Sequence, residues 1–244
     1  MSRVIQMWGR GSCAILGIRI RVTGSVPQRP HFIVSNHLSY VDILVLAALT
    51  GCRFVAKVEI ARWPIFGPMC RVVDTWFVDR QNSRNLLRLL EDMKREGVAG
   101  WPVVLFAEGT TGPGHRVLRF RSPLLELPVV LGQPVDWVAL SYRVPPESSP
   151  AYLSVSWWAE MPLVPHLLSL MKLPWIETKV TFGNESVTGK DRKQLAAQLW
   201  EKVSGAFEPM VDSEEIERLE RLRREHPESA PPLLRPRGQA GQLI

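Results

Sequence analysis

Cysteines are scarce in this chain, and their spacing excludes two common roles. The 244 residues contain three of them, Cys13, Cys52 and Cys70. They form no Cys-x-x-Cys pair and have no histidine at a spacing suited to zinc, so we expect no metal site. An odd number of cysteines on apolar segments argues against a disulfide framework. It is typical of reduced, buried thiols in a cytoplasmic protein.

Long hydrophobic runs are also absent. Nothing in the sequence approaches the ~20 uncharged residues that a membrane-spanning helix requires. The apolar piece Cys13–Ile18 stands between Arg10 and Arg19 and lacks a cleavage signal, so it is too short and too interrupted to span. The sequence therefore predicts a protein that is soluble or lies on a membrane surface.

An excess of positive charge narrows the choice of partners. Lys and Arg outnumber Asp and Glu by 30 to 24, and residues 212–244 carry a net charge of −1, which leaves +7 on the rest. This charge suits nucleic acid, a phosphate-bearing molecule or an anionic membrane. Single-strand binders interleave basic and aromatic residues, which Lys190–Lys193 approaches without matching, so we expect no nucleic-acid partner. A non-catalytic basic module that binds lipid or nucleic acid remains the alternative of a different class.

Apolar periodicity predicts strands that alternate with helices. We expect helices at residues 2–12, 40–49, 83–96 and 191–207, and strands at residues 18–22, 31–34, 53–57, 103–106, 135–142, 152–158 and 176–182. Residues 63–68 are expected to form a turn-rich link. Alternation of this kind favours the α/β class, as a single domain with a central, largely parallel mixed sheet flanked by helices.

The composition divides the chain into three parts. Residues 1–14 are expected to form an amphipathic N-terminal helix, and residues 15–211 form the main domain. Residues 212–244 begin with a charged helix that ends at Glu225. From Pro227 onward the Pro/Gly-rich end has too little apolar content to pack, so we expect a disordered tail.

His37 and Asp42 are the most informative pair in the sequence. Two residues five apart on one helix point about 140° away from each other. They can meet if His37 lies in the loop before the helix and Asp42 lies in its first turn. Asp42 would then hold one ring nitrogen and leave the other as a base for a substrate hydroxyl. Ser39-x-x-Asp42 also resembles a capping box, in which Asp42 satisfies backbone donors alone, and both interpretations stay open.

Two further polar segments follow apolar runs. Asp79-Arg80 ends a buried strand expected at residues 76–78, and residues 108–111 (Glu-Gly-Thr-Thr) follow the strand expected at 103–106. Each segment also has an ordinary explanation: Asp79-Arg80 as a surface ion pair, and Glu108-Gly109 as a plain loop. However, three polar segments at the ends of three strands predict one site, because parallel strands end at the same edge of a sheet.

In chain order these residues resemble the sequence blocks of the glycerophospholipid acyltransferases, the 1-acyl-sn-glycerol-3-phosphate acyltransferase family. The resemblance covers about residues 15–208. It departs from the family pattern at Ala107, where proline is usual, and at Thr111, where many members that use lysophosphatidate have arginine. The matching residues are Asn36, His37 and Asp42 of an Asn-His-x4-Asp block, Phe77–Arg80 of a second block, and Phe106, Glu108, Gly109 and Thr110 of a Phe-Pro-Glu-Gly-Thr block.

The resemblance implies transfer of a fatty acyl group from acyl-CoA or acyl carrier protein to the hydroxyl of a lysolipid. It implies that His37 is the catalytic base and Asp42 its partner, with no metal and no cofactor. The absence of a Gly-x-Ser-x-Gly elbow and of a reactive cysteine favours direct transfer over a covalent acyl-enzyme. The residues expected to bind substrate are Asn36, Lys57, Arg80, Glu108, Gly109 and Thr110.

The acceptor is left open by the sequence. Lysophosphatidate is the first expectation, because it is the commonest acceptor in the family. Residues 106–125, 165–168 and 191–193 look most like bacterial branches that include the lyso-ornithine lipid acyltransferases, which gives the alternative. A thioester hydrolase that uses His37 and water is a further rival.

Both substrates carry fatty chains, so the resemblance implies a peripheral protein on the cytoplasmic face of the inner membrane. Its basic surface suits anionic lipid. The nine tryptophans fit a membrane–water boundary or an ordinary core. Residues 161–171 fit a lipid-docking segment or a core helix equally well.

Overall fold

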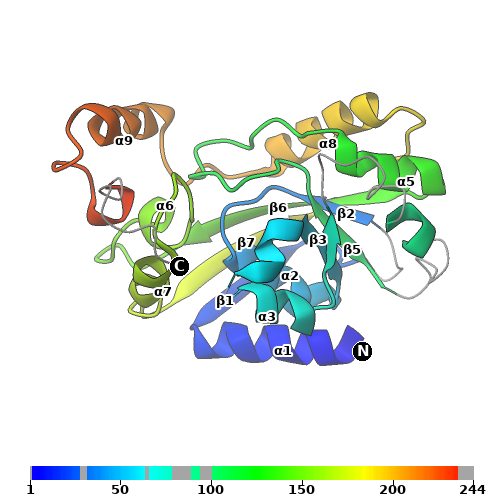
Figure 1. Cartoon of the computed structure of the whole chain (residues 1–244), viewed down its shortest axis with the longest axis horizontal. Coiled ribbons are helices and arrows are strands. Elements are labelled where there is room, and N and C mark those ends of the chain that lie inside the picture. Colours follow the sequence, from blue (N-terminus) through cyan, green and yellow to red (C-terminus); the bar gives the residue numbers. More distant parts are fainter. Residues whose placement is uncertain (1, 28–31, 64–65, 79–88, 94–100, 236–244) are drawn as a thin grey trace.

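The computed structural model describes residues 2–27, 32–63, 66–78, 89–93 and 101–235 (Figure 1). The elements in chain order are α1 (Ser2–Ile15), β1 (Ile18–Thr23), β2 (Phe32–Ser35), α2 (Val41–Thr50), β3 (Arg53–Lys57), the 3-10 helix η1 (Val58–Arg62), α3 (Phe66–Val72), β4 (Trp76–Val78), β5 (Val103–Phe106), η2 (Pro123–Leu125), α5 (Glu126–Leu131), β6 (Val135–Arg143), α6 (Ala151–Ser154), α7 (Leu163–Leu170), β7 (Ile176–Phe182), α8 (Arg192–Ala206), α9 (Ser213–Glu225) and η3 (Pro232–Leu234).

The strands form one seven-stranded sheet in the order β1-β7-β6-β2-β5-β3-β4. Neighbouring strands are parallel except for β6 and β7, which pair antiparallel. Helices lie on both sides of this sheet (Figure 1). The predicted α/β class with a largely parallel mixed sheet is therefore confirmed.

Alternation along the central strands builds two cores. In β2, Ile33 packs toward α1 and α2, while Phe32 and Val34 pack toward the other face. In β5, the side chains of Val104 and Phe106 pack on the same face as α1 and α2. Those of Val103 and Leu105 pack on the opposite face. The second face is covered by the helical residues 89–93, η2, α5 and α8. Central strands buried on both faces are therefore apolar at almost every position.

The parallel set β2, β3, β4 and β5 ends at one edge of the sheet. The segment after β2 leads through His37 into α2, and the segment after β5 leads through Glu108 and Thr110. The topology thus brings together loops that are about 70 residues apart in the sequence. This is the edge where parallel α/β sheets place their ligands.

The C-terminal elements pack against the segment around α6 and α7. Ile216 and Leu219 of α9 share a buried cluster with Trp158, Met161 and Leu234. The prediction that the Pro-rich end does not pack is wrong for Leu234, which is 1% exposed, because α9 and residues 158–161 together form an apolar surface for it. Residues 236–244 lie outside the described residues. The proposed boundaries at residues 14 and 211 remain predictions.

Two local predictions differ from the structure. Residues 152–158 do not form a strand: α6 covers residues 151–154, and Pro150 stands at its N-cap. Side-chain bonds from Ser154 to the carbonyls of Ser149 and Pro150 secure this turn, which overrides the strand preference of the local sequence. The link expected at residues 63–68 contains the start of α3. Of the helix expected at 83–96, residues 89–93 are described and are helical.

Gly9 is the point of closest approach between α1 and α2. A β-carbon at this position would lie 2.5 Å from the backbone nitrogen of Ala48 and 2.9 Å from the carbonyl oxygen of Leu44. The two helix backbones can meet here because glycine has no side chain. By contrast, a β-carbon at Gly11 would meet nothing within 4 Å.

Alanine substitutions at these two glycines should act in opposite directions. Gly9→Ala should lower the free energy of unfolding by about 1–3 kcal/mol, because the added methyl forces α1 away from α2. Gly11→Ala is the matched control and should raise it by up to ~1 kcal/mol through helix propensity. Urea unfolding followed by circular dichroism measures both. Equal effects of the two substitutions would contradict the close packing at Gly9.

Candidate active site

His37 and Asp42 meet where β2 leads into α2. The Nδ1 atom of His37 lies 2.7 Å from Oδ2 of Asp42. Asp42 is in the first turn of α2 and is fully buried, whereas the His37 side chain is 18% exposed. An ionised carboxylate has no proton to donate, so the hydrogen of this bond belongs to Nδ1, and Nε2 carries the free lone pair. An imidazole held in this way can accept a proton from a bound hydroxyl.

The Asp42 carboxylate also satisfies the backbone of the turn. Its Oδ2 accepts hydrogen bonds from the amides of Leu38 at 2.7 Å and Ser39 at 3.0 Å. The N-cap residue of α2 is Tyr40, whose side chain forms no cap bond. The Asp42 carboxylate therefore both satisfies backbone donors before α2 and bonds the ring of His37, so the two interpretations apply together. The backbone bonds fix the position from which Asp42 reaches the ring.

The imidazole of His37 stacks on an aromatic pair from the neighbouring strands. Its ring centroid lies 3.9 Å from that of Phe106, with an angle of 14° between the planes. Phe106 in turn stacks on Phe54, 6.0 Å away. Stacking on Phe106 restrains the face of the imidazole, and the bond to Asp42 restrains its Nδ1 edge. Together they fix the orientation of the ring.

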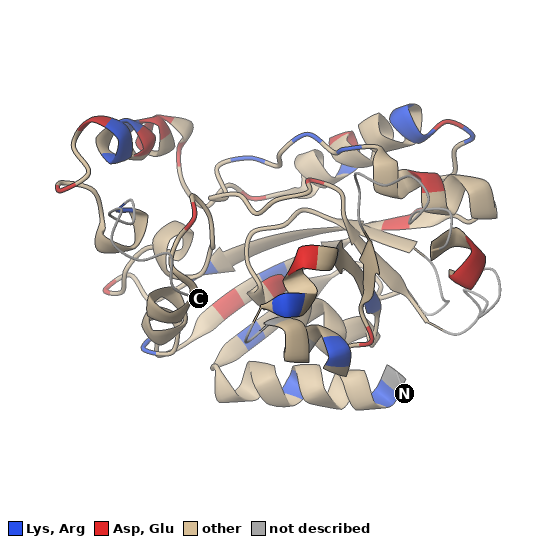
Figure 2. Ribbon diagram, in the orientation of Figure 1, with Lys and Arg blue, Asp and Glu red and all other residues tan. Residues whose placement is uncertain are grey.

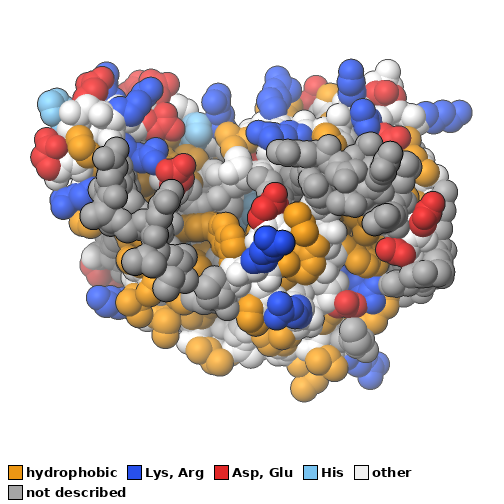
Figure 3. Space-filling model, viewed as in Figure 1, with side chains coloured by type: hydrophobic (Ala, Val, Ile, Leu, Met, Phe, Trp, Pro, Cys, Tyr) orange, Lys and Arg blue, Asp and Glu red, His pale blue; other side chains and the backbone are white. Residues whose placement is uncertain are grey.

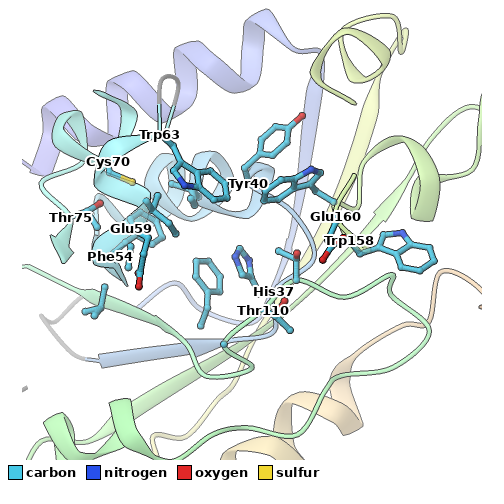
Figure 4. Close-up of a pocket in the computed structure, with 18 of the residues that line it drawn as sticks. His37, Tyr40, Phe54, Glu59, Trp63, Cys70, Thr75, Thr110, Trp158 and Glu160 are labelled. Atoms are coloured by element: carbon cyan, nitrogen blue, oxygen red, sulfur yellow. The ribbon is translucent and has the colours of Figure 1, made fainter. Parts of the chain in front are cut away.

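His37 lines a cavity of about 500 Å³. In Figure 4, Phe54, Glu59, Trp63, Cys70 and Thr75 stand on one side of the imidazole, and Thr110, Trp158 and Glu160 stand on the other. The walls are mainly apolar, with hydroxyls near the histidine. A chamber of this size and character suits a ligand with a hydrocarbon part and a small polar part. The charged side chains among its described lining residues are those of Glu59 and Glu160.

Glu108 holds the two loops of the site together. Its Oε1 accepts a hydrogen bond from the His37 amide at 2.9 Å, and its Oε2 accepts one from the Leu118 amide at 3.3 Å. Burial raises the pKa of Glu108 to about 8, an effect that the two backbone donors partly offset and the charge of Asp42 reinforces. The carboxyl group is therefore a bridge between the segments after β2 and β5.

Asn36 forms a second bridge, toward β6. Its Nδ2 donates to the carbonyl of Leu140 at 2.9 Å, and its Oδ1 accepts from the Leu140 amide at 2.8 Å. Asn36 and Glu108 are 0% and 3% exposed, and neither belongs to the described lining of the cavity. Both residues position backbone here, whereas their expected contact with substrate remains a prediction.

Comparisons with known proteins agree on one family. The profile of the acyltransferase family matches residues 19–135. A lyso-ornithine lipid O-acyltransferase of Rhizobium meliloti is 36% identical over 187 residues, which make up 72% of this chain and 64% of that protein. Another from Brucella abortus is 34% identical over 215 residues, or 83% of this chain and 80% of that protein. The chain thus spans slightly less than two thirds of the first relative's length.

The chain belongs to the glycerophospholipid acyltransferase family. A 1-acyl-sn-glycerol-3-phosphate acyltransferase of Neisseria gonorrhoeae is 30% identical over 143 residues, 58% of this chain and 56% of that protein. The crystal structure of the acyltransferase PlsC from Thermotoga maritima matches with a TM-score of 0.60 at 22% identity, over 84% of this chain and 77% of that one, which shows the fold. The predicted family and the O-acyltransferase class are confirmed.

The remaining predicted site residues of this acyltransferase fall into two groups. Gly109 and Thr110 line the cavity together with Thr111, and Gly109 has a φ of 75°, which favours glycine. Lys57 is the last residue of β3, and its side chain, like the whole of Arg80, lies outside the described residues. Among the described residues, no group of three or more His, Cys, Asp or Glu side chains could hold a metal ion.

Sequence reasoning missed two side chains that contact the His37 loop or its partner. The hydroxyl of Tyr142, near the end of β6, donates to Oδ1 of Asp42. His166 of α7 lies 3.0 Å from the hydroxyl of Tyr40 through Nδ1 and 3.0 Å from the Ser156 carbonyl through Nε2. Burial lowers the pKa of His166 to about 4, so it is a neutral bridge. These partners are 100 and 126 residues apart in the sequence, and no local pattern connects them.

Proposed function

We propose that this protein transfers a fatty acyl group from an acyl thioester to the free hydroxyl of a lysolipid. The observation that carries the proposal is the His37 imidazole, which lines an apolar cavity while Asp42 holds its Nδ1. A ring fixed in this way offers Nε2 to a hydroxyl inside the cavity. Family membership supports acyl transfer as the reaction.

In the proposed reaction the acceptor oxygen attacks the thioester carbonyl while Nε2 of His37 takes the hydroxyl proton. The buried negative charge of Asp42 stabilises the resulting imidazolium. Collapse of the tetrahedral intermediate breaks the carbon–sulfur bond, and the imidazolium returns the proton to the departing thiolate. A positioned base of this kind contributes about 10²–10⁴-fold. The hydroxyls of Thr110 and Thr111 line the cavity and can donate to the oxyanion.

The acceptor that the chain supports best is a lyso-ornithine lipid. Four lyso-ornithine lipid O-acyltransferases match at 32–36% identity. Thr111 stands where an arginine would suit an acceptor phosphate. In addition, Glu59 and Glu160 are the charged groups of the described lining, and a carboxylate attracts the amine of an ornithine head group. Lysophosphatidate is the second candidate, supported by the two Neisseria relatives of that name.

An acceptor panel tests the reaction and the acceptor together. Labelled acyl-CoA or acyl carrier protein is supplied with lyso-ornithine lipid, with lysophosphatidate or with no acceptor. We expect transfer to lyso-ornithine lipid, slow release without acceptor, and a fall of at least about 100-fold in His37→Ala. His226→Ala, an exposed histidine in the segment after α9, is the matched control and should retain activity. Fast release of free acid without acceptor would point to a hydrolase instead.

The acceptor would be reached from an anionic bilayer that contacts an apolar rim formed by α1 and α7. The rim consists of exposed Val4, Met7 and Ile15 on α1 and Val164, Leu168 and Met171 on and beside α7, each 55–84% exposed. Figure 3 shows hydrophobic side chains along the lower edge of the molecule, where Figure 1 places both helices. The turn between α1 and β1 lies beside the segment that follows α7, because the carbonyl of Gly17 accepts a hydrogen bond from the Ile176 amide and Arg19 of β1 lies over the ring of Trp175.

The charge of α1 also favours an anionic bilayer as the partner. Neither α1 nor α7 contains an acidic residue, and Arg3 and Arg10 of α1 are exposed. Figure 2 shows basic and no acidic positions along α1. Each such cation contributes about 1 kcal/mol near an anionic lipid surface. None of the helices in the described part of the chain has the length and hydrophobicity to cross a bilayer. In the proposal, the apolar rim and these cations dock on one leaflet.

Charged substitutions on the rim should release the protein from vesicles. Met7→Asp combined with Leu168→Asp should weaken binding to anionic vesicles by at least about tenfold, because both side chains leave the lipid and two negative charges are added. Val130→Asp changes an exposed apolar side chain on α5, away from the rim, and is the control. Sedimentation with vesicles measures both. Unchanged binding of the double variant would contradict the rim as the docking surface.

A further inference from the structure

The Asp42 carboxylate has bonding partners on both oxygens. Oδ2 accepts from Nδ1 of His37 and from the Leu38 and Ser39 amides. Oδ1 accepts from the hydroxyl of Tyr142. A carboxylate that is fully buried needs such donors, because water cannot replace them. Within the described residues, the Tyr142 hydroxyl is the donor that reaches Oδ1.

Tyr142 is placed by the same strand that Asn36 holds. Asn36 bonds both backbone groups of Leu140, and Tyr142 lies two residues further along β6, on the same face of the strand. The register between the His37 loop and β6 therefore determines where the tyrosine hydroxyl points. Asn36, the first residue of the Asn-His-x4-Asp block, thus anchors the strand from which Tyr142 donates to Asp42.

The Tyr142 hydroxyl carries its proton and is therefore a donor to Asp42. Burial and the neighbouring Asp42 raise the pKa of Tyr142 well above its ordinary value. Among the described residues, the titratable groups near this pair are His37 and Glu108, beside Asp42, and Cys13 on α1, beside Tyr142. Burial raises the pKa of the Cys13 thiol to about 11. Tyr142 is thus a neutral donor facing a charged acceptor, which makes a strong type of hydrogen bond.

We propose that Tyr142 is a positioning residue of the acyl-transfer site, acting through Asp42 on the orientation and basicity of His37. The inference rests on the proposed function, in which His37 is the base. The hydroxyl prevents the carboxylate from rotating away from Nδ1. It also withdraws charge from the carboxylate and so limits how strongly Asp42 attracts the protonated ring. Tyr142 does not belong to the described lining of the cavity, so the role proposed for it is positioning and not contact with substrate.

Removing the hydroxyl should change both the rate and its pH dependence. Tyr142→Phe should lower kcat for lysolipid acylation about 10- to 100-fold, the range for a hydrogen bond to a charged group, with KM within about twofold. The acidic limb of the kcat/KM profile should move to higher pH, because the freed carboxylate attracts the imidazolium more strongly. A kcat and a pH profile equal to those of the unmodified protein would overturn the proposal.

A graded substitution separates positioning from simple packing. Tyr142→3-fluorotyrosine keeps the ring and the hydroxyl but makes the hydroxyl a stronger donor, so the acidic limb should move to lower pH, opposite to Tyr142→Phe. Tyr152→Phe is the matched control: it loses a hydroxyl bond to Glu215, 3.3 Å long, outside the site, and should leave both limbs unchanged. Shifts of the same sign in both Tyr142 variants would assign Tyr142 a packing role and overturn the inference.

These variants distinguish a folding defect, a failure of the proposed function and a failure of the role of Tyr142. If Tyr142→Phe fails to fold, the fluorinated variant still gives the sign of the shift. If the unmodified protein and Tyr152→Phe transfer no acyl group to any lysolipid, the proposed function fails. If both transfer and the Tyr142 variants match them, the role of Tyr142 alone fails.

Discussion

The geometry of this site depends on one fully buried carboxylate. Asp42 accepts bonds from the His37 ring, from two backbone amides of the loop and from the Tyr142 hydroxyl. The same loop is held at three more points. Glu108 accepts from the His37 amide, and the amides of Gly112 and Trp157 donate to the carbonyls of His37 and Leu38. Such a loop cannot shift without leaving buried polar groups unpaired, which is costly. The imidazole is therefore preorganised.

The fold supplies these contacts from several distant segments and leaves the apolar rim of α1 and α7 exposed. β2, β5 and β6 bring the loop, Glu108 and Tyr142 to one place, while α1 and α2 cover the core beneath them. His166 ties α7 to Tyr40 at the start of α2. The helices that carry the apolar rim thus pack directly on elements of the site. Under the proposed function, this packing connects the docking surface to the elements that hold His37.

The sequence predicted the parts of this arrangement that local patterns encode. The His37–Asp42 spacing, the strands at 103–106 and 176–182 and the order of polar segments all follow from periodicity and turn position. Three features could not be predicted from the sequence. Residues 152–158 have strand-forming side chains but adopt a turn after Pro150. The backbone bonds of Glu108 and Asn36 join segments 71 and 104 residues apart, which a local motif does not contain. Tyr142 reaches Asp42 through strand register, which single-sequence patterns do not contain.

The central claim is that a negative charge fixed at Asp42 makes His37 a base for the lysolipid hydroxyl. Asp42→Asn keeps the shape of the side chain and removes the charge, so it separates the two roles of this residue. The most direct measurement is kcat/KM for transfer from labelled acyl-CoA to lyso-ornithine lipid in this variant, with folding checked by circular dichroism. The account predicts a folded protein that is slower by about 10³-fold or more. A folded variant within tenfold of the unmodified protein would contradict it.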